Sequence, residues 1–133
     1  MYSITVRNNI LIAHSLPGEV FGPAQNMHGA TYIVDAEFFA EKVNKYNIIM
    51  DLGVVTDILS EVLKFYSYKN LDEVDEFKGV ITSTEFLARD IYDRICLKLK
   101  SNYSNDYQLL HKLKITLTES NVAWASFEQE IEK

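Results

Sequence analysis

Two histidines are the side chains best suited to chemistry in this sequence, because the residues around them predict that they meet. From His28 to Phe38 the residue types alternate, which places His28 on the otherwise apolar face of a strand. His14 lies near the end of another alternating segment, residues 3–16. Pro-Gly and Gly-Pro pairs within residues 16–23 predict a loop that returns the chain antiparallel. We therefore expect the two histidines at facing strand ends, as a candidate metal site.

Glu119 is a second candidate, since it is an acid on a predicted apolar strand face. It shares its parity with Leu113, Ile115 and Leu117. A buried carboxylate is costly unless a partner satisfies it, so we expect either a ligand or an ion pair there. A turn at 119–121 and a last strand at 122–131 follow, and Trp124 is expected to pack in the sheet or at a subunit boundary.

The elements that must position these residues follow from periodicity and capping signals. Asp51 is a predicted N-cap, and the helix after it carries an apolar stripe at three- and four-residue steps: Val54, Val55, Ile58, Leu59, Val62, Leu63 and Tyr66. Residues 82–85 form a capping-box pattern that opens a second helix, whose stripe is Phe86, Leu87, Ile91, Ile95 and Leu99. Residues 67–81 are predicted to be a long loop, and residues 101–106 a turn-rich break. Asn8-Asn9 predicts a bulge or tight turn in the first strand.

The resulting order is strand, strand, helix, helix, strand, strand. Strands that neighbour each other as hairpins, with the helices grouped together, predict an α+β domain. We expect a four-stranded antiparallel sheet with two helices on one face, formed by residues 1–133 as a single domain.

Composition narrows the classes of function. The chain has 133 residues, 47% of them apolar, which is enough for a real core. A formal charge of −6 argues against a broad nucleic-acid surface. The sequence also lacks a run of about eighteen apolar residues, which a membrane span would need. The single cysteine, Cys96, is expected to be a packing residue and fits a reducing compartment. We expect a cytoplasmic protein whose partners are small molecules or further subunits.

Six short motifs occur in an order typical of one family: Ala13-His14-Ser15-Leu16, Met27-His28-Gly29, Met50-Asp51-Leu52, Lys69-Asn70-Leu71-Asp72, Thr84-Glu85-Phe86-Leu87-Ala88 and Thr118-Glu119-Ser120. Together they resemble the 6-pyruvoyl-tetrahydropterin synthase and 6-carboxytetrahydropterin synthase family, the latter of the queuosine pathway. The resemblance covers nearly the whole chain. It implies the tunnelling fold (T-fold), in which subunits join their sheets into a barrel, as trimers or hexamers, and bind pterins at subunit boundaries.

The resemblance also implies a zinc ion on three histidines, and here the sequence departs from the family. His14 and His28 match two of these ligands, but the family's His-x-His pair reads His28-Gly29-Ala30. Residues two apart on a strand face the same side, so Ala30 stands where the third imidazole is expected and has no lone pair to donate. Glu19 is the first candidate for a replacement ligand and His111 the second.

The family's proton-transfer residues are changed as well. Ala24 occupies the position of the catalytic cysteine, and Ser67-Tyr68 replaces the Asp-His dyad. Alanine cannot act as a base. Tyr68, beside Lys69, is left as a candidate for moving a proton.

Recognition of the pterin is better preserved. Glu119 matches the family glutamate whose carboxylate accepts hydrogen bonds from the pterin ring, and Thr84 matches the threonine or serine beside that ring. Lys69 is a further candidate for substrate binding. Glu85, by contrast, is expected to serve in the capping box.

These inferences predict a pterin-binding enzyme, a metal-assisted carbon-oxygen lyase acting on 7,8-dihydroneopterin triphosphate or a related dihydropterin. In this hypothesis Glu119 anchors the ring, a metal on His14 and His28 polarises the side chain, and Glu19 or Tyr68 moves the proton. An aldolase-like cleavage of the pterin side chain and a non-catalytic pterin- or purine-binding protein are the alternatives.

Overall fold

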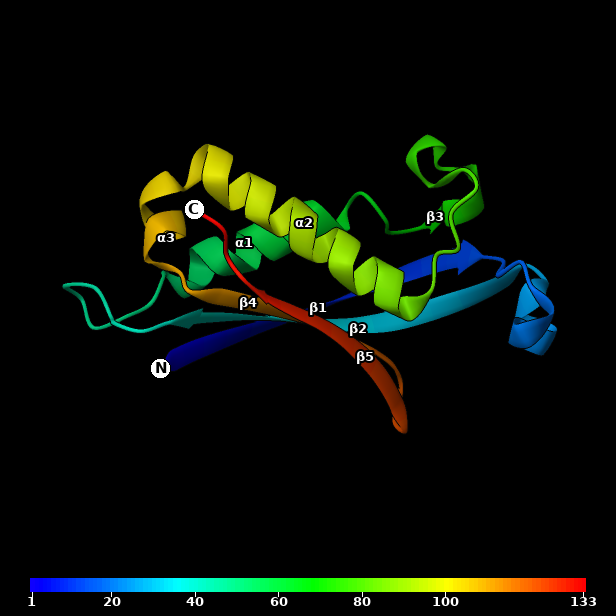
Figure 1. Ribbon diagram of the computed structural model, residues 1–133, viewed down its shortest axis with the longest axis horizontal. Helices are drawn as coiled ribbons and strands as arrows, with labels where there is room; N and C mark the ends of the chain where they lie inside the picture. Colours follow the sequence, from blue (N-terminus) through cyan, green and yellow to red (C-terminus); the bar gives the residue numbers. More distant parts are fainter.

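A computed structural model describes residues 1–133, and in it helices pack on one face of a twisted five-stranded sheet (Figure 1). The sheet has the order β3-β1-β2-β4-β5. Its strands are β1 (Tyr2–His14), β2 (His28–Ala40), β3 (Lys69–Asn70), β4 (Lys112–Ser120) and β5 (Ala123–Glu130). The α+β class and the antiparallel arrangement of the four long strands are confirmed. The sheet of the single chain is open, with β3 and β5 at its edges.

The helices cover the face that the alternating pattern makes apolar. They are α1 (Leu52–Leu63), α2 (Thr84–Asn102) and α3 (Ser104–Leu109), and 3-10 turns occur at η1 (Glu19–Gln25), η2 (Leu71–Glu73) and η3 (Asp75–Phe77). Asp51 is the N-cap of α1, as predicted, because its side chain accepts a hydrogen bond from the Val54 N–H. The predicted stripe residues Ile91, Ile95 and Leu99 of α2 are fully buried against the sheet. None of the helices combines the length and apolar character that a membrane crossing requires.

Several predictions about the elements are wrong in detail. β1 pairs with β2 without a break from Tyr2 to His14, so Asn8-Asn9 forms neither a bulge nor a turn. The predicted loop at 67–81 contains β3, which adds a fifth strand parallel to β1, and α3 is a third helix where residues 101–106 predicted only a turn-rich break. These pieces are too short to produce a periodic pattern in the sequence.

The start of α2 also differs from the prediction. Ser83 is the N-cap, with its side chain accepting from the Phe86 N–H, so the capping box does not begin at Thr82. Glu85 is then the second helical residue rather than the third, which removes it from the capping-box role.

A polar network attaches the connector between α1 and α2 to the helices. The Tyr66 hydroxyl donates to Asp90 at 2.5 Å, and Arg94 donates to Asp90 at 2.9 Å and to Glu76 at 2.7 Å. The Arg94 guanidinium also lies 3.7 Å from the centre of the Phe65 ring. The connector is therefore held at several points, although most of it has no regular secondary structure.

Candidate functional site

The two candidate histidines meet at one end of the sheet. The antiparallel register of β1 and β2 places His14 directly opposite His28, with ring centroids 4.6 Å apart and ring planes at 62°. His14 is buried, whereas His28 is partly exposed. The structure thus brings together the pair that the loop between the strands predicted.

Each of these rings is oriented by a hydrogen bond at Nδ1. His28 Nδ1 lies 2.9 Å from the backbone carbonyl oxygen of Asn26, and a carbonyl can only accept, so Nδ1 carries the proton and Nε2 the lone pair in the neutral ring. His14 Nδ1 lies 3.0 Å from Oγ1 of Thr82. Burial lowers the pKa of His14, the charge of His28 lowers it further, and Asp72 acts in the opposite direction.

These two imidazoles have no third metal-ligating side chain beside them. Ala30, paired with Ile12 on the same face, contributes only a methyl group, and the chain contains no group of three or more His, Cys, Asp or Glu side chains that could hold a metal ion. His111 is wrong as a replacement ligand, because it lies beside Phe39, at the opposite end of β2 from His28. Glu19 is exposed at the first residue of η1. The residues present do not fit a zinc site with three protein ligands.

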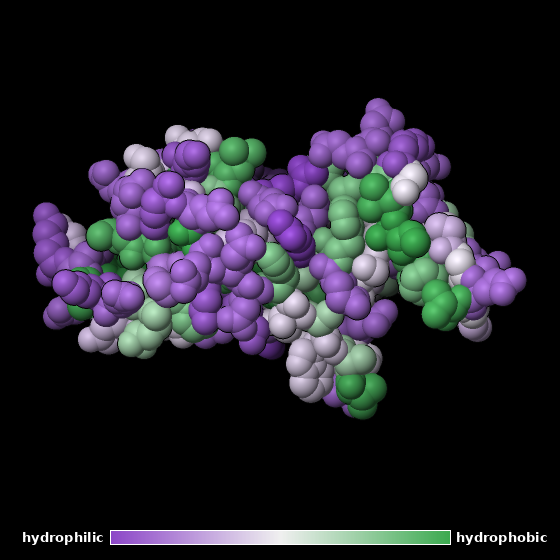
Figure 2. Space-filling model, viewed as in Figure 1, coloured by the Kyte–Doolittle hydropathy of each residue, from purple (hydrophilic) through white to green (hydrophobic).

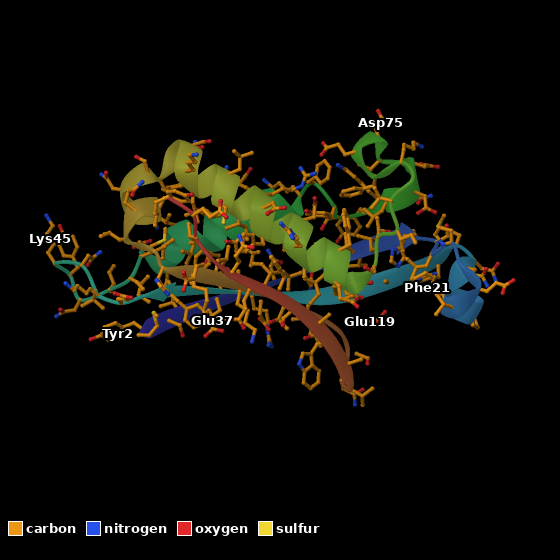
Figure 3. All side chains as sticks on the ribbon, viewed as in Figure 1. Tyr2, Phe21, Glu37, Lys45, Asp75 and Glu119 are labelled. Carbon is orange, nitrogen blue, oxygen red and sulfur yellow. The ribbon has the colours of Figure 1, made fainter.

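Glu119 borders a separate small depression near the N-terminal end of α2 (Figure 3). This depression has a volume of about 240 Å³ and is lined by Thr84, Glu85, Glu119, Ala123, Trp124 and Ala125. A register shift between Thr118 and Ser120 leaves Glu119 at an irregular point of the hairpin. Its carboxylate is exposed and has neither an ion-pair nor a hydrogen-bond partner in the chain.

Tyr32 lies on β2 between His28 and the end of the pairing with β4, and its residue type alone did not mark it as a site residue. Thr84 Oγ1 lies 3.5 Å from the buried Tyr32 hydroxyl, at the limit of a hydrogen bond. Burial raises the pKa of Tyr32, the hydrogen bond with Thr84 lowers it, and the charges of Glu119 and Glu85 raise it. The β2-β4 pairing ends with Ile33 opposite Thr118, which places Tyr32 and Glu119 next to each other just beyond that pair. Tyr32 shares its strand face with Ala30 and His28, and this shared parity is the signal that could have revealed it.

Tyr68 and Lys69 lie elsewhere on the surface of the chain. The Tyr68 side chain is 85% exposed, with a left-handed backbone (φ 60°) and its N–H bonded to the Leu11 carbonyl at 2.6 Å. The Lys69 Nζ lies 5.0 Å from the centre of the Phe65 ring. Both residues line a shallow depression that shares no residue with the one at Glu119. Within one chain, therefore, the structure does not bring these two candidates to Glu119.

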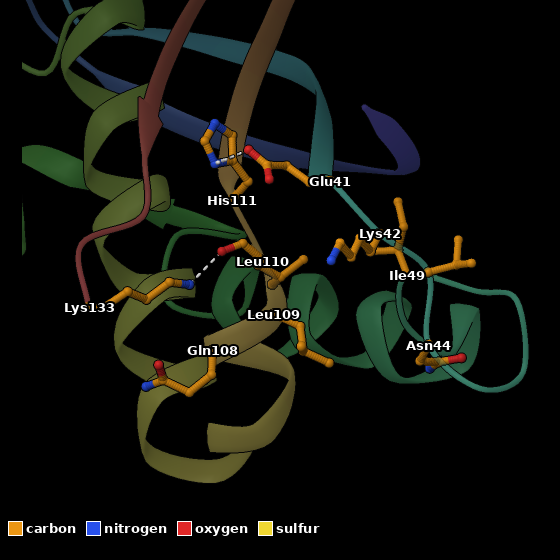
Figure 4. Close-up of a pocket in the computed structure, with 10 residues that line it drawn as sticks. Glu41, Lys42, Asn44, Ile49, Gln108, Leu109, Leu110, His111 and Lys133 are labelled. Atoms are coloured by element: carbon orange, nitrogen blue, oxygen red, sulfur yellow. Dashed lines mark hydrogen bonds and ion pairs between the residues drawn. The ribbon is translucent and has the colours of Figure 1, made fainter.

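A further hollow, of about 420 Å³, lies at the other end of the molecule (Figure 4). His111, Glu41 and Lys133 are among its lining residues. Glu41 approaches the His111 ring at 3.9 Å, and Lys133 Nζ donates to the backbone carbonyl of Leu110. These three groups are paired, whereas the side chains of Lys42 and Gln108, which also line the hollow, have no hydrogen-bond or ion-pair partner in the chain.

Comparisons with known proteins agree with the geometry. The sequence model of the family described as 6-pyruvoyl tetrahydropterin synthase matches residues 3–130. A 6-pyruvoyl tetrahydrobiopterin synthase of Dictyostelium discoideum is 30% identical over 105 residues, which cover 77% of this chain and 73% of that protein.

Solved structures support the same fold. The Caenorhabditis elegans 6-pyruvoyl tetrahydropterin synthase superposes with a TM-score of 0.81 at 21% identity, covering 96% of this chain and 95% of the other. The Plasmodium vivax 6-pyruvoyl tetrahydropterin synthase gives a TM-score of 0.79 at 14% identity, covering 98% of both chains. With a family match over almost all its length, this chain belongs to the 6-pyruvoyl tetrahydropterin synthase family.

Proposed function

We propose that this chain binds a dihydropterin at the open end of its sheet and acts on it as a carbon-oxygen lyase, with 7,8-dihydroneopterin triphosphate or a related dihydropterin as substrate. The observation that carries the proposal is the unpartnered carboxylate of Glu119 beside Thr84. A pterin ring presents an N–H and an adjacent exocyclic amine, and a carboxylate accepts both through its two oxygens.

The spacing along β2 suits a ligand that reaches from Glu119 toward the histidines. Tyr32 and Glu119 each lie just beyond the Ile33-Thr118 pair, and His28 is four residues from Tyr32 on the same strand face, which corresponds to about 13 Å. That span is comparable to a bicyclic ring with a three-carbon side chain. The ligand's side chain then lies near His28 while its ring stays with Glu119.

Elimination needs a base near that side chain, and His28 is the candidate that shares the strand face of Tyr32. Its Nδ1–H is held by the Asn26 carbonyl, which leaves the Nε2 lone pair free to take a proton. When the proton leaves carbon, its electron pair forms a carbon-carbon double bond, and the carbon-oxygen bond to the triphosphate breaks. Glu19 and Tyr68 are the other candidates for this proton transfer, and Glu19→Gln and Tyr68→Phe variants compare them with His28→Gln.

Metal assistance, with zinc on His14 and His28, is the alternative to His28 acting as the base, because the one free lone pair of that ring cannot serve both, and it can be measured directly. If the gap at Ala30 limits zinc binding, Ala30→His should retain stoichiometric zinc through purification, whereas the wild type and the matched control Ala30→Val should not. Metal analysis of the three proteins provides the measurement. Stoichiometric zinc in the wild type would contradict this expectation and restore a metal-assisted reaction.

A pterin-binding protein without catalysis is the second candidate function. It is favoured by the alanine at position 24, which has no ionisable group, and by the exposure of Tyr68. The two functions share the Glu119 anchor and differ only in turnover.

We also propose that the protein works as a homo-oligomer, a trimer or a hexamer. Two edges of the sheet have free backbone groups: β5, and β1 apart from Ile12 and Ala13, which pair with β3. Figure 2 shows a small hydrophobic group at the tip of the β4-β5 hairpin. Val122 and Trp124, in and beside the turn of this hairpin, have 79% and 65% of their areas exposed. Free edges and exposed apolar groups favour pairing with another copy. Light scattering coupled to gel filtration tests this, and a monomer would contradict it.

Product analysis with 7,8-dihydroneopterin triphosphate tests the reaction. Release of triphosphate supports the lyase, whereas carbon-carbon cleavage of the side chain supports an aldolase-like enzyme instead. Binding without any product supports the non-catalytic alternative. Absence of both binding and turnover for dihydropterins would overturn the proposed function.

A further inference from the structure

Apart from tyrosines, the chain buries only two polar side chains, and these two lie within hydrogen-bonding distance of each other. His14 and Thr82 are each 1% exposed, and His14 Nδ1 lies 3.0 Å from Thr82 Oγ1. The two residues are 68 positions apart in the sequence, so tertiary packing alone brings them together. A buried polar group without a partner is costly, which means that each of these side chains depends on the other.

The geometry leaves Nε2 as the ring nitrogen of His14 that is free for a ligand. Nδ1 lies 3.0 Å from Thr82 Oγ1, whereas Nε2 has no hydrogen-bond partner in the chain. A neutral imidazole carries one N–H and one lone pair, and a hydroxyl oxygen can accept the N–H. With the proton on Nδ1, the Thr82 hydroxyl oxygen accepts, and Nε2 is the nitrogen left with a lone pair.

A second contact from the same connector fixes the residue after His14. Asp72 accepts the Ser15 N–H at 3.1 Å and the Ser15 hydroxyl at 2.5 Å. The connector between α1 and α2 thus holds two consecutive residues, one at the end of β1 and one just beyond it, through Asp72 and Thr82. Since His28 is held separately by Asn26, the pair is assembled from two independent attachments.

We propose that Thr82 is a positioning residue that holds His14 in the Nδ1–H tautomer, so that Nε2 meets the ligand beside His28. The part of this inference that concerns a ligand rests on the proposed function, whereas the tautomer does not. Metal-ligating and catalytic imidazoles commonly depend on such a partner at their other nitrogen.

Nitrogen NMR of the ligand-free protein, labelled with ¹⁵N-histidine, tests the tautomer directly. The chain has three histidines, so single His→Gln variants assign every signal. At pH 8 we expect the Nδ1–H pattern for His14 in the wild type, in Thr82→Ser, which keeps the hydroxyl, and in the matched control Thr84→Val. In Thr82→Val we expect a shift toward the Nε2–H form. An Nε2–H pattern in the wild type would overturn the inference, even if Thr82→Val failed to fold, and so would a Thr82→Val spectrum identical to that of the wild type.

Titration with a dihydropterin separates this inference from the proposed function. We expect Thr82→Val to lose about tenfold in affinity or turnover, the lower range for a supporting partner, and Thr82→Ser to stay close to the wild type. If the wild type binds no pterin, the proposed function fails while the tautomer result stands. If the wild type binds and Thr82→Val binds and reacts equally well despite an altered tautomer, the positioning role is refuted.

Discussion

The two ends of strand β4 differ in the pairing of one polar residue each: His111 is paired, and Glu119 is not. Just before the start of β4, His111 donates its backbone N–H to the Phe39 carbonyl at 2.8 Å and accepts the Ile131 N–H at 2.9 Å. Its ring lies 3.5 Å from a carboxylate oxygen of Glu130. Near the other end, the Glu119 carboxylate has no partner within the chain. The first end fixes the chain, and the second leaves an acceptor available to a ligand.

The kind of unpaired group is a better guide to a binding site here than the size of the hollow. The hollow at His111 has about 420 Å³, against about 240 Å³ at Glu119. Of its two lysines, Lys133 already donates to the carbonyls of Tyr107 and Leu110, and the unpaired one, Lys42, is a cation rather than an acceptor. The smaller depression, by contrast, offers a free carboxylate.

The largest expected effects come from shortening a buried side chain near each end of β4 and comparing the two variants. Leu113 and Leu117 are both fully buried on β4, and replacement of either by alanine should lower the free energy of unfolding by about 2–5 kcal/mol, because each leaves a cavity. Only Leu117→Ala, two residues from Glu119, should also weaken dihydropterin binding by the folded protein. Urea unfolding and pterin titration measure the two effects. Equal loss of pterin affinity in both variants would contradict the division between the two ends.

Glu119→Gln should weaken ligand binding strongly and change stability only slightly, unlike the core substitutions. Loss of the charged acceptor is expected to weaken dihydropterin binding by about 1.5–3 kcal/mol, roughly 10- to 150-fold, while stability changes by no more than about 0.5 kcal/mol. Isothermal titration and thermal unfolding provide the measurements, with Glu130→Gln as the control at the other end. Unchanged affinity in Glu119→Gln would remove this residue from the site.

The smallest expected effect is the dependence of the free energy of unfolding on pH, in which buried His14 should differ from partly exposed His28. Burial lowers the pKa of His14 below its ordinary value of 6.5, so the unfolded chain binds a proton at pH values where the folded chain does not. The free energy of unfolding should therefore fall as the pH drops below 6.5, by at most about 1.4 kcal/mol per pH unit, until folded His14 is protonated as well.

Urea unfolding between pH 5 and 8 checks this expectation. His14→Gln should have a shallower dependence on pH than the wild type, whereas His28→Gln, at the partly exposed position, should retain more of it. A wild-type slope unchanged by His14→Gln would show that His14 does not carry this effect.

Local patterns predicted much of the molecule correctly. The alternation from His28 to Phe38 and the loop signals after His14 were sufficient to predict that the two histidines face each other. Asp51 was identified as an N-cap for a similarly local reason. Such signals depend on residues close together in the sequence, which explains why they can be read without a structure.

Contacts between distant segments could not be predicted from such local patterns. β3 consists of two residues whose pairing with Ile12 and Ala13 leaves no periodic trace, and α3 is only six residues long. Thr82 was assigned to a capping box, yet it is a buried partner of His14. Nothing in the residues around Thr82 encodes a contact across 68 positions.

The sequence by itself determined the alternating strands, the helix stripes, the histidine pair and the departures at Ala24 and Ala30, because residue type and spacing are properties of the chain alone. Only the tertiary structure decided that Thr82 lies against His14, that Thr84 reaches the Tyr32 hydroxyl, and that His111 lies far from His28. The physical reason is that burial and hydrogen bonding between distant segments depend on how the helices and their connector pack on the sheet, and this packing is fixed only when the whole chain folds.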